Sequence, residues 1–379
     1  MKLQKLLFFF LLSSFFFFSC KTEQKQTVLK ENKTSIKYAK GFDIHYFDSY
    51  KKIIIKAPYP DAKEQFEYAI IPKGKTIPET LKDLKIVRTP IAQMVVTSTT
   101  HIPMLELLEA ENNLVGFPNT QYISSSKTRQ LIANGTIKEL GKEENINTEI
   151  LLELNPEIVV GFSMSSNNKM FENIEKAGIP VLLNGDWLEE TPLGRAEWLK
   201  FFGVLFDKEK VADSIFNIIE KDYNEAVLLA KEATTKPTIL SGVQFKDVWN
   251  LPAGESFVAK FLKDANTDYL WAESKGKGSL SLSFESVFEK AQQADLWIAP
   301  GHYTSYTQLK EANQHYTQFD AFSNKKIYSF NNKTGENGGV LYYELAPIQP
   351  HIVLKDIIKI AHPELLPNYV PYFLEKLQE

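Results

Sequence analysis

The sequence contains one cysteine, Cys20, in 379 residues. Because a disulfide needs two thiols and zinc-thiolate sites usually need several, this count excludes intrachain disulfides and cysteine-rich zinc sites. A surplus of positive charge is also missing, since 43 Lys and Arg residues stand against 47 Asp and Glu residues and the net charge is −4. A chain without a basic surplus is a poor match for nucleic acid, so we expect no such partner.

Signatures of catalysis are absent as well. The sequence has no nucleophile motif, no Walker loop and no Gly-x-Gly-x-x-Gly, and its six histidines form no His-x-x-x-His pair. The glycine-rich stretch GENGG at 335–339 follows polar residues and predicts a mobile loop rather than a phosphate cradle. We therefore expect no enzyme activity, no intrinsic cofactor and no dedicated metal site.

Long hydrophobic runs are confined to the first residues, MKLQKLLFFFLLSSFFFFSC. Two lysines, an apolar run and a small residue before Cys20 are typical of a secretory signal, and the run is short for a spanning helix. The stretch resembles a bacterial lipoprotein signal, which implies that residues 1–19 are removed and that Cys20 carries lipid. Residues 20–36 are polar and aperiodic, as expected of a flexible tether. We expect a lipid-anchored protein of the cell envelope, facing the periplasm or on the cell surface.

The remainder of the chain predicts an α/β protein with an N-terminal β extension. Residues 37–84 alternate apolar and polar residues around a Pro-containing turn, which predicts strands. In residues 85–206, helix-like segments separate four apolar runs, which predicts a mostly parallel sheet in an N-terminal lobe. The runs are KIVRTPIAQMVVTSTT, NLVGFP, PEIVVGFS and IPVLLNGD. Residues 235–379 repeat the alternation as a C-terminal lobe, with runs such as TILSGVQF, DLWIAPG and KKIYSFNN.

A long amphipathic helix is predicted over residues 207–234, between the two lobes. Asp207 can cap its start and Thr234 to Pro237 ends it. At 1.5 Å per residue, about 25 residues span about 38 Å, enough to run from one lobe to the other. Apolar residues recur at helical spacing, at Val211, Ile215, Ile218, Ile219, Ala226, Val227 and Ala230.

Several local patterns, in this order, resemble the helical-backbone class of substrate-binding proteins, which serve ABC importers of iron complexes and vitamin B12. They are LNPEIVVG, GIPVLL, the helix after GRAEWLKFFG, and WNLPAGESFVAKFLKDA. The resemblance covers about residues 85–379. It implies two Rossmann-like lobes bridged by one helix, a monomer, a permease dimer as partner, and a metal chelate as ligand: a ferric siderophore, haem or cobalamin.

The resemblance also implies that one glutamate on each lobe docks onto permease arginines. Glu149, seven residues before Pro156, occupies the first such position, and Glu285 precedes the strand DLWIAPG in the equivalent unit. Glu153 and Glu289 lie one turn later and remain alternatives. A purely structural role is also open, because acids in the first turn of a helix are favoured by the helix dipole.

The ligand is expected between the lobes, at the carboxyl ends of the strands. The loops there are rich in aromatic residues with a few polar groups, which suits a large and partly flat ligand. Arg195 could pair with an anionic chelate, and His101 and His302 could bind its metal. The candidate residues are Thr99, His101, Phe117, Tyr122, Phe162, Trp187, Arg195, Phe245, Trp249, His302, Tyr303 and Tyr306.

Two other functions remain open at this point. A binding protein for free metal ions would bring three or more His, Asp or Glu side chains within metal distance. A chelatase-type enzyme would use His101 or His302 with a carboxylate to insert metal into a tetrapyrrole.

Anchoring through Cys20 can be tested directly. In Cys20→Ala the predicted lipid attachment is lost, and because acyl chains supply the membrane affinity, the protein should move into a soluble envelope fraction. Membrane fractionation followed by immunoblotting checks this, with Ser19→Ala as a control that keeps the thiol. Unchanged membrane association of Cys20→Ala would contradict lipidation at this residue.

Overall fold

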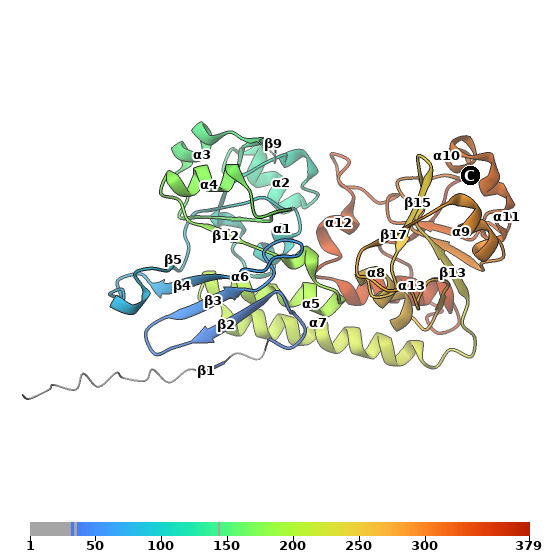
Figure 1. Ribbon diagram of the computed structural model, residues 1–379, viewed down its shortest axis with the longest axis horizontal. Coiled ribbons are helices and arrows are strands. Elements are labelled where there is room, and N and C mark those ends of the chain that lie inside the picture. Colours follow the sequence, from blue (N-terminus) through green and yellow to red (C-terminus); the bar gives the residue numbers. More distant parts are fainter. Residues whose placement is uncertain (1–31, 34–35, 143–144) are drawn as a thin grey trace, which may run out of the picture.

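The computed structural model describes residues 32–33, 36–142 and 145–379. Two α/β lobes lie side by side along the long helix α7 (Glu209–Ala230) (Figure 1). The predicted signal peptide and Cys20 lie outside the described residues. Part of the predicted tether is described and is ordered as a strand. Asn32–Lys33 form β1, which pairs with β2 (Phe42–Tyr46). In the described part of the chain, no helix is both long and apolar enough to cross a membrane.

Lobe one is built on a five-stranded parallel sheet with the order β12-β11-β6-β7-β8. All four predicted apolar runs contribute a strand, because short continuous apolar strands suit a sheet that is covered on both faces. The strands are β6 (Met94–Val96), β7 (Leu114–Phe117), β8 (Lys138–Glu139), β11 (Ile158–Gly161) and β12 (Val181–Leu183). The helices are α1 (His101–Leu107), α2 (Ser126–Ala133), α3 (Thr148–Leu154) and α4 (Lys169–Lys176), and a ribbon of β9 (Gly141–Lys142) and β10 (Asn145–Ile146) precedes α3.

The N-terminal extension is a separate sheet that takes one strand from the region predicted as lobe one. Its order is β1-β2-β3-β4-β5, with β3 (Lys51–Ile55), β4 (Phe66–Pro72) and β5 (Lys85–Thr89). The run KIVRTPIAQMVVTSTT therefore divides: β5 pairs with β4 of the extension, and β6 enters the sheet of lobe one. Pro90 follows β5, and proline has no amide hydrogen with which to continue a strand ladder. The predicted boundary at residue 84 thus moves beyond β5.

Two buried carboxylates attach the extension to lobe one. The amides of Lys37, Tyr38 and Ala39 donate to Glu197, with Tyr38 N to Oε2 at 2.7 Å. Those of Lys40 and Gly41 donate to Glu189, which also accepts from Trp198 Nε1 at 3.0 Å. Both carboxylates are buried, and burial raises the pKa of Glu189 although these hydrogen bonds oppose the shift.

Lobe two contains a five-stranded sheet with the order β16-β13-β18-β19-β20 and a smaller antiparallel sheet, β14-β15-β17. The predicted strand TILSGVQF divides between them at Gly242, whose φ of +75° favours glycine. The strands are β13 (Thr238–Ser241), β14 (Val243–Phe245), β15 (Val248–Pro252), β16 (Asp268–Tyr269), β17 (Ser279–Leu282), β18 (Leu296–Ile298), β19 (Ile327–Ser329) and β20 (Glu375–Lys376). The helices are α8 (Phe257–Asp264), α9 (Phe284–Ala291), α10 (Tyr306–Ala312), α11 (Asp320–Ser323), α12 (Leu341–Leu345) and α13 (Pro350–Ala361).

Helix α7 is shorter than predicted, and the face that it buries differs. It has 22 residues, and Lys208 stands at its N-cap instead of Asp207, which binds Lys51 Nζ of the extension at 2.7 Å. Val211 and Ile218, predicted for the apolar face, are exposed. The buried face comprises Ala212, Phe216, Ile219, Tyr223, Ala226 and Ala230.

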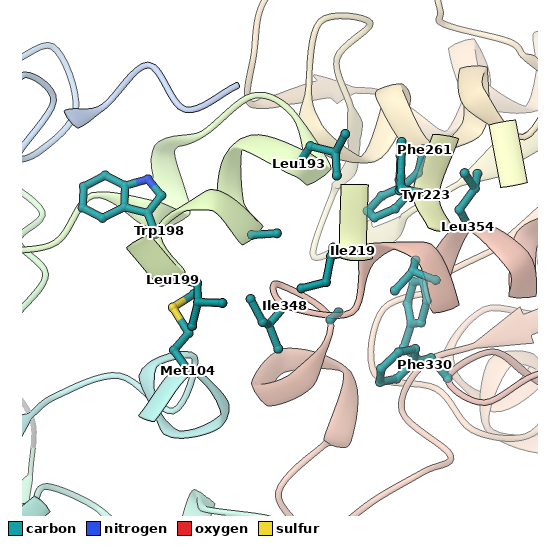
Figure 2. Packing of buried hydrophobic residues seen from close by; sticks show 14 of the residues in the cluster. Met104, Leu193, Trp198, Leu199, Ile219, Tyr223, Phe261, Phe330, Ile348 and Leu354 are labelled. Atoms are coloured by element: carbon teal, nitrogen blue, oxygen red, sulfur yellow. The ribbon is translucent and has the colours of Figure 1, made fainter. Parts of the chain in front are cut away.

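The buried face of α7 lies in a core that both lobes share. On the lobe-one side it packs with α5 (Pro192–Glu197) and α6 (Leu199–Leu205), and on the lobe-two side with α13. Figure 2 shows the continuity, with Leu199 and Met104 on one side of Ile219 and Leu354 and Phe261 on the other. Because close-packed interiors transmit displacement, the lobes should move relative to each other as packed bodies and not as independent domains.

The attachment of the extension generates a stability prediction. In Glu197→Ala three amides lose a buried acceptor, so the free energy of unfolding should fall by on the order of 3 kcal/mol. Glu190→Ala is the matched control, because Glu190 forms ion pairs at the surface, with Lys40 and Lys277, and should cost about 1 kcal/mol or less. Urea unfolding followed by circular dichroism compares the two. Equal losses would show that the buried carboxylate is not the attachment point.

Candidate functional site

The carboxyl ends of the parallel strands place most predicted ligand residues on loops. In lobe one, Thr99 follows β6, Tyr122 follows β7, and Phe162 and Trp187 follow β11 and β12. In lobe two, His302 and Tyr303 follow β18. Because parallel strands end at the same edge of a sheet, each lobe gathers these loops on one side, where ligands bind in open α/β sheets.

Arg195 connects the two lobes at one end of this arrangement. It lies in α5, and its Nη2 donates to the carbonyl oxygen of Trp187 at 2.9 Å. Its guanidinium stands 3.7 Å from the ring centroid of Phe257, the first residue of α8 in lobe two. The ring of Trp187 in turn meets Phe162 edge to face, with 6.3 Å between centroids. The guanidinium is thus held by a backbone carbonyl of its own lobe and by an aromatic ring of lobe two.

Burial leaves this cation with unused hydrogen-bonding capacity. Desolvation lowers the pKa of Arg195, while nearby Asp186 acts in the opposite direction, and the guanidinium remains charged because arginine titrates so far above neutrality. Asp186 Oδ2 is occupied in part by Thr100 Oγ1 at 3.0 Å. Among the described residues, Arg195 Nε and Trp187 Nε1 have no hydrogen-bond partner although both are buried. The two unpaired donors stand on residues that the Nη2 hydrogen bond joins, and each could serve a ligand that brings acceptor oxygens.

Other unpaired polar atoms gather around the same strand ends. Thr97 follows β6 and Asn184 follows β12, and the described chain offers no partner to Thr97 Oγ1 or Asn184 Nδ2. Thr97 and Phe162 also line a pocket of about 570 Å³ on lobe one, together with Ser163, Met164 and Phe171. Buried polar groups normally have hydrogen-bond partners. The unpaired atoms at this edge of the sheet could therefore bind a polar ligand or ordered water.

Four predicted ligand residues are buried and closed to a ligand in this structure: His101, Phe117, Trp249 and Tyr306. His101 is fully buried at the start of α1, with its ring centroid 5.2 Å from that of Phe202. Burial lowers its pKa against the effect of Asp186, so it is neutral at pH 7. Phe117 is 2% exposed and belongs to the core. Trp249 packs against Trp297 at 5.4 Å and donates from Nε1 to the Ser241 carbonyl at 3.2 Å.

The other candidates reach the surface to different degrees. Tyr122 is 55% exposed and Phe245 is 65% exposed. Thr99 is half-buried, and the exposed ring of His302 lies 4.3 Å from that of Tyr303. His302 and Tyr303 therefore form a second aromatic surface, on lobe two, separate from the Arg195 group of contacts.

Sequence reasoning missed three contributors near Arg195. Phe257 was part of a predicted helix and Asp186 of a predicted loop, but neither was singled out. Tyr342 lies in α12, stacks on Phe330 at 3.8 Å between centroids, and is close enough to influence the pKa of Arg195. Asp186 had a detectable signal, because it is an acid three residues after a buried strand; Phe257 and Tyr342 join the group through tertiary packing.

Metal binding by the protein's own side chains finds little support in the described residues. Nowhere in 36–142 or 145–379 do three His, Cys, Asp or Glu side chains gather at metal-binding distance. His101 is buried and His302 is on the opposite lobe, so the two predicted histidines do not meet in the structure.

Glu149 and Glu285 occupy equivalent positions in the two lobes. Each is the second residue of a short helix, α3 or α9, and each carboxylate is exposed. Asn147 caps α3 through the amide of Ile150, and Ser283 caps α9 through the amide of Ser286. Each helix leads into an inner strand of its sheet, β11 or β18. Because the caps are supplied by other residues, neither glutamate is required to start its helix.

Comparison with known proteins identifies the family. A profile described as periplasmic binding protein matches residues 94–334, more than half of the chain. The chain therefore belongs to the periplasmic binding protein family. Two uncharacterized lipoproteins of Methanocaldococcus jannaschii are 25% and 22% identical to it; the first match covers 92% of this chain and 87% of the relative, and the second 78% and 76%.

Solved structures share the fold, which confirms the predicted two-lobed α/β class. A protein of Staphylococcus epidermidis described as a possible iron-binding, periplasmic solute-binding protein aligns with a TM-score of 0.57 and 16% identity, over 72% of this chain and 100% of that chain. A periplasmic haem-binding protein of Vibrio cholerae aligns with a TM-score of 0.55 and 16% identity, over 70% and 99%. A vitamin B12-binding protein of the same organism gives 0.50 and 11%, over 72% and 97%.

Proposed function

We propose that this periplasmic binding protein is the lipid-anchored substrate-binding component of an ABC importer, and that it captures a metal chelate between its lobes. The observation that carries the proposal is Arg195, a largely buried cation that is hydrogen-bonded to Trp187. Among the described residues, Arg195 Nε and Trp187 Nε1 both lack a partner. A ferric siderophore, haem or a corrinoid presents acceptor oxygens on a large and partly flat body. Such a ligand could pair with Arg195 and lie against the rings of Phe162, Trp187 and Tyr303.

The arrangement favours a chelate over the two alternative functions. A free metal ion would need several protein ligands that converge, whereas a chelate brings its own, and no such convergence occurs in the described residues. A chelatase would need an accessible histidine beside a carboxylate, but His101 is buried beside Phe202. His302 is exposed, and its recorded contact is with the ring of Tyr303. Similar proteins that bind haem and vitamin B12 support the class of ligand without selecting among its members.

The ligand class can be tested with a panel of haemin, a ferric hydroxamate, cyanocobalamin and ferric ion alone, titrated into the full-length protein by calorimetry. We expect one of the three chelates to bind and Arg195→Ala to weaken it by on the order of 2–3 kcal/mol, about 30- to 150-fold, because a buried ionic hydrogen bond is lost. Arg88→Ala is the control, since Arg88 lies on β5 of the extension and donates to the Lys75 carbonyl.

Two outcomes would contradict the ligand assignment. Binding of ferric ion alone, without any chelate, would favour the free-ion alternative. Equal affinities for Arg195→Ala and Arg88→Ala would remove Arg195 from the site.

We further propose that Glu149 and Glu285 dock onto arginines of the permease. Two exposed carboxylates at equivalent positions, one on each lobe, could report the relative position of the lobes to a two-fold symmetric partner. A bidentate contact between each carboxylate and an arginine would also fix the relative orientation of the two side chains.

Docking predicts that Glu149→Ala with Glu285→Ala leaves ligand affinity unchanged while binding to the reconstituted importer falls. The double variant should lose more binding than either single variant, because each carboxylate contacts a separate arginine. The variants Glu153→Ala and Glu289→Ala change exposed acids one turn later and serve as the comparison. A helix-start role instead predicts a stability loss of about 0.3–1 kcal/mol per site. Normal importer binding by the double variant would defeat the docking assignment.

A further inference from the structure

The glycine-rich loop at 335–339, predicted from the sequence to be mobile, is docked onto lobe one. Thr334 and Val340 form a bridge at its base, and the amide of Gly335 donates to the carbonyl of Gly339 at 2.8 Å. A Cβ at Gly339 would stand 2.4 Å from the carbonyl oxygen of Tyr122, and a Cβ at Gly335 would stand 2.8 Å from Ser124 Cβ. The two glycines therefore permit a backbone approach between the lobes that other residues would block.

Residues 334–345, the loop together with α12, are called the strap from here on. The strap reaches lobe one through three sets of polar contacts. Ser124 Oγ donates to the Gly339 carbonyl at 3.1 Å. In the amide orientation that satisfies both partners, the Asn337 side-chain oxygen accepts from Arg129 Nη2 at 2.6 Å. The third set is made by Glu344, whose carboxylate accepts from the amides of Ser124 and Ser125 at 2.6 and 3.0 Å.

The contact made by Glu344 costs the most desolvation energy of the three. Its side chain is buried and lacks a cationic partner among the described residues. The negative charge of Glu344 is stabilised by two amides of lobe one, just before α2. The helix dipole also favours negative charge at this position. If the strap left lobe one, the carboxylate and both amides would return to water together. A docked and a released strap would therefore differ in the solvation of all three groups.

We infer that Glu344 is a latch residue that fixes the strap of lobe two to lobe one and thereby positions α12 beside Arg195. Tyr342, on the same short helix, is close enough to raise the pKa of Arg195, so release of Glu344 would also move an aromatic side chain at the proposed ligand site. The latch itself follows from the geometry alone, whereas its link to ligand capture rests on the proposed function.

The burial of the Glu344 carboxyl gives the latch a pH dependence. Burial, with a smaller effect of Glu106 on α1, raises the pKa of Glu344 to about 7, although the Ser124 and Ser125 amides oppose the shift. The other charged groups near Glu344 have partners of their own. Glu106 accepts a hydrogen bond from Thr128 Oγ1 at 2.6 Å. On α2, Lys127 is paired with Glu111 at 2.7 Å, and Arg129 donates to Asn337. On the strap itself Glu336 is exposed.

The direction of this pH dependence follows from the linkage between docking and proton binding. Because a released Glu344 would have an ordinary, lower pKa, docking takes up a proton, and the docked state is favoured at low pH. The latch should therefore loosen as pH rises from the ordinary range of a carboxyl pKa to about 7, the pKa of the docked carboxyl, and should change little above that.

Hydrogen exchange of the full-length protein, read by mass spectrometry on peptides that contain Ser124 and Ser125, tests the latch without a ligand. In Glu344→Ala the protection of these amides should fall by roughly tenfold, the factor expected for the loss of about one net hydrogen bond. Gly339→Ala should have a similar effect by steric exclusion with Glu344 intact. Glu336→Ala, an exposed acid on the same loop, is the matched control and should change nothing.

The pH profile separates a latch from a merely structural contact. After correction for intrinsic exchange, wild-type protection at Ser124 and Ser125 should be lower at pH 8 than at pH 5.5. Glu344→Gln keeps one carbonyl acceptor but cannot ionise, so its protection should not vary with pH. Circular dichroism confirms that each variant is folded.

Unchanged protection in Glu344→Ala, or the same pH profile in Glu344→Gln and the wild type, would overturn the latch. Because no ligand enters the measurement, that failure would be distinct from failure of the proposed function.

Discussion

The buried face of α7 is the constraint on which the arrangement of the molecule depends. Its six buried residues lie in a core that continues into both lobes through α5, α6 and α13. A rigid helix with close packing on either side limits the ways in which the lobes can separate, because each opening must preserve that packing. Beyond α7, the strap, the contact of Arg195 with Phe257 and the ion pair of Glu190 with Lys277 also connect the lobes.

Much of the fold could be predicted from the sequence because the strands carry their own signal. Short apolar runs such as PEIVVG and DLWI are continuous, as strands covered on both faces must be, and both became inner strands. Errors arose where the signal is not local. β5 resembles a strand of lobe one in composition, but its partner is β4 of the extension. On α7, Val211 and Ile218 are as apolar as the buried Phe216, and only tertiary packing decides which face is covered.

The candidate site was less predictable, for a related reason. Position in a loop after a strand correctly placed Trp187 and Phe162 at the sheet edge, since chain topology fixes that edge. Whether a side chain on such a loop turns outward or into the core depends on neighbours that are distant in sequence. His101 turns onto Phe202 of α6, and Trp249 joins an aromatic cluster with Trp297. Phe257 and Tyr342 reach Arg195 from lobe two, so no local pattern could have grouped them.

Two of the charges that lie between the lobes, Arg195 and Glu344, are not neutralised by an ion pair among the described residues. Arg195 of lobe one lies over the Phe257 ring of lobe two, and Glu344 of lobe two binds the Ser124 and Ser125 amides of lobe one. Aromatic rings and amides compensate a buried charge only in part, whereas a full counter-charge or water would compensate it better. Contacts of this kind hold the lobes together yet remain replaceable. At the proposed site, an anionic ligand would compete for Arg195, and a proton would alter the proposed latch at Glu344, without disturbing the packed helix that joins the lobes.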